Sequence, residues 1–227
     1  MNGFFVTATD TGVGKTEVAC ALLRAARASG IDAVGMKPAQ SGHTPGEPSD
    51  AERLREASGR VEPLAALCPY TLAAPLAPAV AARLEGRKIE LSRILDGARA
   101  LAARHALLVV EGAGGLLVPL TERETFADLA VALALPAIVV ARAGLGTVNH
   151  TALTVEALRR RGVAIAAIVL NRTGPGDDPS VPHNAGEIAR LTGATVVGPL
   201  PFKADITERA AMVQAAMASD VKFSTRA

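Results

Sequence analysis

The segment that most constrains the fold is the turn near the start of the chain, which reads FFVTATDTGVGKT. An apolar run at Phe4–Ala8 is followed by small polar residues with two glycines, and then by Gly14, Lys15 and Thr16 at the start of an alanine- and leucine-rich segment. A strand, a glycine-rich turn and a helix in this order present backbone N–H groups and a helix N-terminus to a phosphate group. The sequence therefore predicts a nucleotide-binding loop of the P-loop type.

The glycine pattern of this loop departs from the usual one at its first position, where the chain has Thr9 in place of glycine. The order of strand, small-residue turn, Gly-Lys-Thr and helix nevertheless favours a nucleotide site over an ordinary tight turn. In such a loop Lys15 would reach the β- and γ-phosphates, and the hydroxyl of Thr16 would contact Mg²⁺.

Buried-strand patterns alternate with helical patterns along most of the chain. The apolar runs are continuous, as in parallel strands that are covered on both faces, and span Phe4–Ala8, Ala33–Met36, Ala106–Val110, Ala137–Ala141, Ala164–Leu170 and Thr195–Val197. Helical periodicity covers Lys15–Ser29, Asp50–Ala57, Leu91–Arg104, Phe126–Leu133, Val148–Arg161, Ala185–Leu191 and Ile206–Ala218. The alternation predicts an α/β fold with a doubly wound, mostly parallel sheet, helices on both faces and a single domain over residues 1–227.

Glycine and proline positions refine this prediction. Gly30, Gly162 and Gly193 each follow a predicted helix, where a left-handed residue commonly ends it. The segments Gly42–Ser49 and Gly174–His183 are rich in glycine and proline, so we expect loops within the domain there.

Composition excludes several classes of partner. A formal net charge of +2 and an aromatic fraction of 3% without Trp argue against a nucleic-acid surface. Apolar stretches are interrupted before they reach bilayer length, and the N-terminus lacks a signal-peptide pattern, so we expect no membrane association. Cys20 and Cys68 match no metal spacing and are expected to be buried thiols in a cytoplasmic protein.

Two acidic residues are candidates for a magnesium site. Glu111 follows an apolar run, so it should lie at the carboxyl end of a strand, and Gly112–Gly115 would let the chain turn closely around a ligand. Asp50 begins a predicted helix, where it could equally be an N-terminal cap. Mg²⁺ bound to a nucleotide takes only one or two protein carboxylates, so this pair would suffice.

Lys37 is a candidate for catalysis. The second predicted strand ends in GMKPAQSG, which places Lys37 at the same sheet edge as the phosphate loop and Ser41 a few residues later. A lysine at a strand end is often only solvated, but cations beside a triphosphate stabilise the charge of a transferring phosphoryl group.

The chain as a whole resembles the dethiobiotin synthetase family. The segments that carry the resemblance are TDTGVGKT (Thr9–Thr16), KPAQSG (Lys37–Gly42), SD (Ser49-Asp50), PYTLAAPLAP (Pro69–Pro78), EGAGG (Glu111–Gly115), GLGTVNH (Gly144–His150) and LNR (Leu170–Arg172). This resemblance implies an enzyme that uses Mg²⁺ and ATP to convert 7,8-diaminononanoate and CO₂ into dethiobiotin, ADP and phosphate. A carbamate would form on one amine and be phosphorylated, and the second amine would close the ureido ring.

The resemblance also implies roles for individual residues. The residues implied in catalysis are Lys37, Lys15 and Thr11, and those implied in holding Mg²⁺ are Thr16, Asp50 and Glu111. ATP would be bound by Gly12, Val13, Gly14, Lys15, Thr16, Glu17, Asp50, Glu111, Gly112, Ala113, Gly114, Asn171, Arg172, Pro201, Phe202 and Lys203. The diamine substrate would be bound by Lys37 and Ser41, and its carboxylate by Gly144, Leu145, Gly146, Thr147, Val148 and Asn149 of the partner subunit in a homodimer.

From the residues alone, the glycines before Thr147 expose N–H groups suited to a carboxylate, although Thr147 could instead be an ordinary helix cap. Three positions depart from the family pattern. Ala8 stands where some members have glycine, Gly12 where some have an acidic residue, and Arg172 where an aspartate often follows the asparagine that reads adenine.

Two other enzyme or switch classes share the expected fold. A partition- or septum-type P-loop ATPase would have a second lysine early in the phosphate loop, where this chain has Thr11. The synthetase half of a cobyrinic acid amidase needs a glutamine-hydrolysing domain, for which 227 residues leave room only if that domain is a separate subunit. A non-catalytic binding module would leave Lys37, Ser41 and Glu111 without a common purpose.

Overall fold

The computed structural model of the protein describes residues 1–42, 46–205 and 207–212. Its main feature is a six-stranded sheet in the order β2-β5-β1-β6-β7-β8, in which every neighbouring pair is parallel. The strands are β1 (Gly3–Ala8), β2 (Ala33–Met36), β5 (Leu107–Glu111), β6 (Ala137–Arg142), β7 (Ile165–Asn171) and β8 (Val196–Leu200). All six predicted strands are thereby confirmed.

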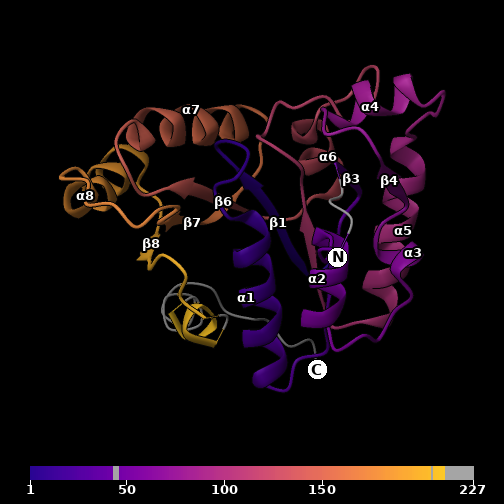
Figure 1. Cartoon of the computed structure of the whole chain (residues 1–227), viewed down its shortest axis with the longest axis horizontal. Coiled ribbons are helices and arrows are strands. Elements are labelled where there is room, and N and C mark those ends of the chain that lie inside the picture. The colour runs from indigo at the N-terminus through magenta and orange to yellow at the C-terminus, as the bar shows by residue number, and fades with distance from the viewer. Residues whose placement is uncertain (43–45, 206, 213–227) are drawn as a thin grey trace.

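Helices cover both faces of the sheet (Figure 1). They are α1 (Lys15–Ala28), α2 (Asp50–Ala57), α3 (Leu64–Leu67), α4 (Pro78–Leu84), α5 (Leu91–Arg104), α6 (Phe126–Leu133), α7 (Thr147–Arg160) and α8 (Val181–Thr192). In β1, Phe4 and Val6 belong to an apolar core shared with α1 and α2, whereas Phe5 belongs to a second core shared with α5, α6, α7 and α8. Successive strand residues point to opposite faces, so burial on both sides explains the continuous apolar run. The predicted doubly wound α/β fold is confirmed.

The position of β1 locates the functional edge of the sheet. β1 lies between β5 and β6, and the loop Thr9–Gly14 leaves its carboxyl end and enters α1. In open α/β sheets, ligands bind outside the carboxyl ends of the strands, at the point where the strand order reverses. Glu111 and Asn171 are the last residues of β5 and β7, so both reach this edge.

Several local predictions need correction. A small parallel sheet of β3 (Ala39–Ser41) and β4 (Tyr70–Leu72), together with α3 and α4, was not predicted because each of these elements is too short for a clear period. α8 begins at Val181, so the predicted loop Gly174–His183 is shorter than expected, since Pro182 suits the first turn of a helix. α7 begins one residue early, at Thr147.

Other local predictions are confirmed. Gly30, Gly162 and Gly193 all have positive φ angles just past a helix. Residues 207–212 are helical, and the rest of the predicted helix Ile206–Ala218 lies outside the described residues. Cys20 and Cys68 are free and buried. Within the described parts of the chain, no helix is both long and apolar enough to cross a membrane.

Candidate functional site

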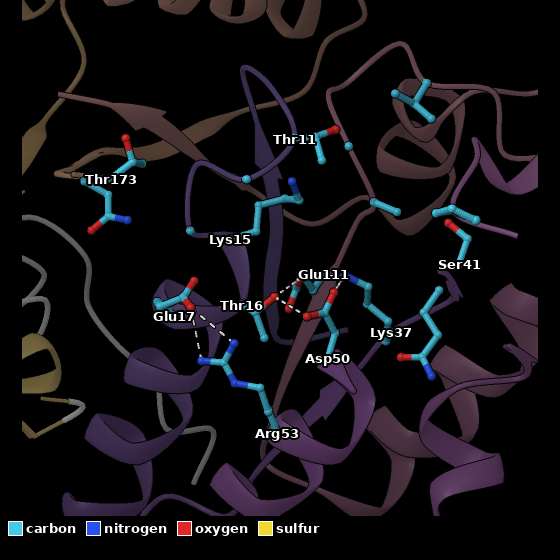
Figure 2. Close-up of a pocket in the computed structure, with 18 of the residues that line it drawn as sticks. Thr11, Lys15, Thr16, Glu17, Lys37, Ser41, Asp50, Arg53, Glu111 and Thr173 are labelled. Atoms are coloured by element: carbon cyan, nitrogen blue, oxygen red, sulfur yellow. Dashed lines mark hydrogen bonds and ion pairs between the residues drawn. The ribbon is translucent and has the colours of Figure 1, made fainter. Parts of the chain in front are cut away.

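A cavity of about 1180 Å³ lies at the carboxyl edge of the main sheet. Its lining includes Thr11, Gly12, Gly14, Lys15, Thr16 and Glu17 from the phosphate loop and the start of α1. The same cavity is lined by Lys37, Ser41, Asp50 and Glu111, and at another part by Asn171, Arg172, Phe202 and Lys203. Most of the predicted site residues, which are far apart in the sequence, therefore face one common space (Figure 2).

The phosphate loop has the backbone geometry that its glycines allow. Gly12 and Gly14 have φ angles of 72° and 97°, in the left-handed region that side chains disfavour. Gly14 is the N-cap residue of α1. It has no side chain to cap the helix, so the first N–H groups of α1 remain available to a ligand. The ammonium of Lys15 donates to the backbone oxygen of Asp10 at 3.2 Å, across the same loop.

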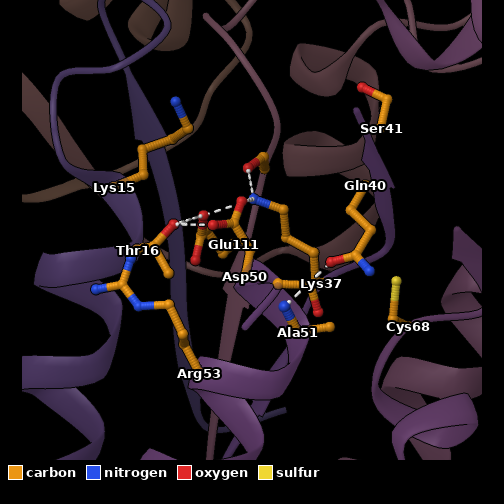
Figure 3. A network of polar contacts seen from close by, with 12 residues as sticks. Lys15, Thr16, Lys37, Gln40, Ser41, Asp50, Ala51, Arg53, Cys68 and Glu111 are labelled. Atoms are coloured by element: carbon orange, nitrogen blue, oxygen red, sulfur yellow. Dashed lines mark hydrogen bonds and ion pairs between the residues drawn. The ribbon is translucent and has the colours of Figure 1, made fainter. Parts of the chain in front are cut away.

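A buried cluster of charges lies beneath this loop (Figure 3). The ammonium of Lys37 lies 2.6 Å from Oε1 of Glu111 and 2.7 Å from Oδ2 of Asp50, and it also donates to the backbone oxygen of Gly112 at 3.2 Å. Lys37 and Glu111 are 2% and 0% exposed, so this ion pair is screened from water. The alternative that Lys37 is simply a solvated lysine is wrong.

Oxygen atoms of three residues converge beside Lys37. The hydroxyl of Thr16 lies 2.9 Å from Oδ1 of Asp50 and 2.8 Å from Oε1 of Glu111. One hydroxyl carries a single proton, so it can donate to only one of these carboxylates at a time. Oε2 of Glu111 is buried and has no hydrogen-bond partner among the described residues. A buried carboxylate oxygen without a partner is costly, which favours an additional cation at this place.

This donor set fits Mg²⁺. Asp50 and Glu111 place two carboxylates beside the hydroxyl of Thr16, and within the described residues no group of three or more His, Cys, Asp or Glu side chains could hold a metal ion. Mg²⁺ prefers oxygen ligands and usually keeps several waters, with one or two carboxylates from the protein. Two carboxylates and one hydroxyl are therefore a sufficient set.

The ionisation of the cluster follows from burial and pairing. Burial raises the pKa of Glu111, and Lys37 only partly offsets this. Burial also disfavours the charge of Lys37, but the attraction of Glu111 and then Asp50 outweighs it and raises the pKa of Lys37. Burial alone would raise the pKa of Asp50, but Lys37 outweighs it and holds that pKa below its ordinary value. Lys15 differs, because burial and then the nearby charge of Lys37 lower its pKa.

Asp50 is not the cap of its helix. Ser49 caps α2 by accepting a hydrogen bond from the backbone N–H of Glu52, whose side chain in turn accepts one from the N–H of Ser49. This capping box leaves the carboxylate of Asp50 free to face Thr16 and Lys37. The alternative interpretation of Asp50 as a cap is therefore wrong.

The neighbouring wall of the cavity comes from the small sheet and the segment after it. Ser41, at the end of β3, donates to the backbone oxygen of Leu76 at 2.7 Å. Gln40 accepts from the backbone N–H of Ala51 at 3.1 Å, which ties this sheet to α2. Pro75–Pro78 and Gln40 line the cavity but were not predicted as site residues, because nothing in a short proline-rich segment indicates which cavity it faces.

The remaining wall contains Asn171 and residues that follow β8. Nδ2 of Asn171 donates to the backbone oxygen of Val13 at 3.0 Å, and Oδ1 accepts from Arg209 at 2.8 Å. A Cβ atom at Gly14 would lie only 2.1 Å from Nδ2 of Asn171, so this approach requires glycine.

Some predicted residues touch the site indirectly, and some lining residues were not predicted. Val13, Gly112 and Pro201 contribute backbone oxygens to side chains of the site but do not line the cavity. The cavity is also lined by Arg53, Val118, Thr173, Ala204 and Arg209, for which the sequence pattern gave no signal. Arg53, on α2, forms an ion pair at 3.2 Å with Glu17 in the first turn of α1.

The loop Gly144–Asn149 does not line this cavity within the single chain. Gly146 precedes α7 in a left-handed conformation without a side-chain cap, so the alternative that Thr147 caps the helix is wrong. Thr147 is instead buried, 3.3 Å from the hydroxyl of Thr151. Leu145 is 81% exposed, and its N–H donates to the carboxylate of Asp178 at 2.8 Å. The loop therefore presents an apolar side chain to the outside of the chain.

Structural similarity is to P-loop proteins. The MinC:MinD cell division complex of Aquifex aeolicus aligns with a TM-score of 0.59 at 14% identity, covering 96% of each chain. A ParA family ATPase of Chlorobium tepidum aligns with a TM-score of 0.54 at 18% identity, covering 97% of this chain and 93% of that one. At such identities the similarity establishes the fold and nothing further, so it does not support the partition- or septum-type alternative.

Sequence similarity is far more specific. The family described as "AAA domain" matches residues 2–210. A protein of Anaeromyxobacter dehalogenans (strain 2CP-1), named ATP-dependent dethiobiotin synthetase BioD, is 73% identical over 98% of this chain and 100% of its own length. A protein of the same name from Bacillus cereus (strain B4264) is 44% identical over 89% of this chain and 84% of its own length. This chain therefore belongs to the ATP-dependent dethiobiotin synthetase family of ligases.

Proposed function

We propose that this enzyme converts 7,8-diaminononanoate, CO₂ and ATP into dethiobiotin, ADP and phosphate. One observation carries the proposal. The buried ammonium of Lys37 lines the same cavity as the phosphate loop. It lies 2.7 Å from the carboxylate of Asp50 and 2.6 Å from that of Glu111. All three N–H donors of Lys37 are used by Asp50, Glu111 and Gly112, so Lys37 would act through its nearby positive charge on a negatively charged carbamate that receives a phosphoryl group.

ATP would bind along the cavity from the phosphate loop to Asn171. Backbone N–H groups of Gly12–Glu17 and the side chain of Lys15 would hold the triphosphate, with Gly112–Gly114 beside it. Thr16, Asp50 and Glu111 would hold Mg²⁺, which when bound neutralises charge on the phosphate oxygens. The base would lie beside Asn171, between Arg172 and the segment Pro201–Lys203.

The reaction would proceed in three steps. The nitrogen of one amine attacks the carbon of CO₂ and loses a proton, which gives a carbamate. A carbamate oxygen attacks the γ-phosphorus, and ADP leaves. The nitrogen of the second amine then attacks the carbonyl carbon, which closes the ring as phosphate leaves with the C–O bond electrons and a proton is lost.

The chain's own residues would orient and stabilise these steps. Lys37 and Lys15 would stabilise the negative charges of the carbamate and of the transferring phosphoryl group, and Thr11 lines the same space. Ser41 would bind the diamine at the wall formed by the small sheet. Its hydroxyl, which donates to Leu76 at 2.7 Å, still has lone pairs to accept a hydrogen bond from an amine.

The active form would be a homodimer. The substrate carboxylate would be held by Gly144–Asn149 of the partner subunit, through N–H groups other than those of Leu145 and Thr147, which already donate to Asp178 and Gly144. The exposure of Leu145 (81%) and of Leu153 (56%) on α7 supports an apolar contact between two subunits there. We further propose a cytoplasmic enzyme without a membrane or nucleic-acid partner.

A turnover assay tests the function. Purified protein with Mg-ATP and bicarbonate should release ADP only when 7,8-diaminononanoate is present, and dethiobiotin should appear in equal amount by mass spectrometry. Turnover without the diamine would contradict the proposal. Stimulation by DNA or membranes would instead favour a partition- or septum-type switch, and stimulation by glutamine would favour an amidase-like synthetase.

A further inference from the structure

Arg209 makes three hydrogen bonds at the wall of the cavity around Asn171. Its Nη1 donates to Oδ1 of Asn171 at 2.8 Å, its Nε to the backbone oxygen of Ala204 at 3.0 Å, and its Nη2 to that of Pro201 at 3.3 Å. Arg209 is 6% exposed, so these bonds face little competition from water. One side chain thus joins the end of β7 to the loop that follows β8.

The amide of Asn171 is held from two sides. Nδ2 donates to the backbone oxygen of Val13 at 3.0 Å, while Oδ1 accepts from Arg209 at 2.8 Å. Turning the amide over would bring Oδ1 against the oxygen of Val13 and Nδ2 against the donor of Arg209. Both contacts would then be repulsive, so they select a single orientation of the amide.

With its orientation fixed, the amide of Asn171 can form a limited number of further hydrogen bonds. A carboxamide has two N–H donors and two acceptor lone pairs, and these two contacts use one of each. One donor and one acceptor remain for a ligand in the cavity that Asn171 lines. Adenine presents an amino donor beside the N7 acceptor, whereas guanine presents two acceptors, O6 and N7. The remaining capacity of Asn171 therefore matches adenine and leaves one repulsive contact with guanine.

We propose that Arg209 is a positioning residue that fixes the amide of Asn171 for adenine and so makes the site prefer ATP to GTP. The inference rests on the proposed placement of the base beside Asn171. Arg209 would act through Asn171 rather than by reading the base itself. Its bonds to Pro201 and Ala204 would also hold Phe202 and Lys203, which line the same part of the cavity.

Binding of Mg-ATP and Mg-GTP, measured by calorimetry without the diamine, tests this role. In Arg209→Met the ratio of the two affinities should fall about tenfold, because a well-placed bidentate contact distinguishes bases by roughly that factor or more. Arg209→Lys should keep most of the preference, because an ammonium can still donate to Oδ1. Arg99→Met, which removes an exposed arginine from α5, should leave the ratio unchanged.

A double variant separates positioning from a merely structural effect. Asn171→Ala should lose the preference, and adding Arg209→Met to it should change the ratio no further, since the two residues act as one unit. An independent additional loss in the double variant would overturn the inference. So would an unchanged ratio in folded Arg209→Met, or a wild-type protein that binds both nucleotides equally.

Thermal unfolding establishes that each variant is folded. If Arg209→Met is not folded, Arg209→Gln is used in its place.

The dethiobiotin assay keeps this inference distinguishable from the proposed function. A wild-type protein that prefers ATP but forms no dethiobiotin would contradict the function and leave the role of Arg209 standing. Dethiobiotin formation together with an unchanged ratio in Arg209→Met would contradict only the role of Arg209.

Discussion

Lys37 and Glu111 form a fully buried ion pair, with Nζ 2.6 Å from Oε1, at the place where the phosphate loop meets the carboxyl ends of β2 and β5. Buried ion pairs are costly to assemble, so their presence is weak evidence for stability and better evidence for a functional demand. In the proposed mechanism, that demand is a fixed cation beside a triphosphate.

Lys37→Met should reduce dethiobiotin formation about 100- to 1000-fold, because one electrostatic donor at a reacting anion contributes about that much to the rate. The measurement is initial rate at saturating Mg-ATP. The exposed Lys88 provides the matched control, since Lys88→Met removes the same charge at a surface position. Near-wild-type turnover in Lys37→Met would remove this lysine from the mechanism.

The same variant should be less stable by about 3 kcal/mol at pH 8, because removing one partner of a buried pair leaves an uncompensated charge. Burial raises the pKa of Glu111, so this carboxyl can take up a proton as the pH falls. The loss in free energy of unfolding should therefore be smaller at pH 5, close to the ordinary glutamate value, than at pH 8. Urea unfolding at both values checks this, and an equal loss at the two values would contradict it.

Gly14→Ala should weaken nucleotide binding and destabilise the fold by about 1–3 kcal/mol. The φ angle of 97° is unfavourable for alanine, and the added Cβ would meet Nδ2 of Asn171 at 2.1 Å. Gly162→Ala shares the positive φ angle, at 74°, but its Cβ would meet nothing within 4 Å. Thermal unfolding and ATP titration of both variants separate the effect of the Cβ contact with Asn171 from that of the strained φ angle. Equal losses of stability in the two variants would count against the contact with Asn171.

Glu62, which does not line the cavity, makes a pH-dependent contribution to the stability of the fold. Hydrogen bonds from Arg104 and then His105 hold the pKa of Glu62 below its ordinary value of 4.5. A carboxyl group whose pKa is lower in the folded than in the unfolded protein stabilises the fold at a pH above its unfolded-state pKa. This stabilisation is lost as the pH falls through its folded-state pKa. Glu62→Gln should thus be less stable than wild type at pH 7, and the difference should shrink below pH 4.5. A difference that stays constant to pH 3 would refute the role of this charge.

Both cysteines should be unreactive in the native protein. Burial raises the pKa of Cys20 to about 12, and burial raises that of Cys68 as well. The thiolate is the reactive form, so a disulfide reagent at pH 8 should modify neither thiol in the folded protein and both after unfolding. Rapid native modification would show that one of them is accessible.

The sequence predicted the fold well because strands buried on both faces leave continuous apolar runs, such as Phe4–Ala8, which become β1. It predicted the cavity because residues that follow parallel strands meet at one sheet edge, as Lys37 and Glu111 do. It did not predict β3, β4 or α4, since elements of a few residues carry no usable period.

The contacts made by Arg53 and Arg209 depend on long-range packing and therefore could not be predicted from the sequence. Arg53 lies on α2 and reaches Glu17 on α1, and Arg209 reaches Asn171 at the end of β7. A single arginine in a helical segment has no local pattern that distinguishes a ligand-facing side chain from a solvated one. The role of Asp50 was ambiguous for the same reason, until Ser49 proved to cap the helix.

The close approach of Gly14 to Asn171 has a consequence for how this sequence can vary. Any side chain at position 14 would occupy the space of the amide at position 171. The two positions therefore cannot be exchanged independently, and a larger residue in the loop would be tolerated only together with a smaller one at the end of β7. Partial recovery of the stability of Gly14→Ala by Asn171→Gly, with the strain of the φ angle at position 14 remaining, would reveal this mutual exclusion.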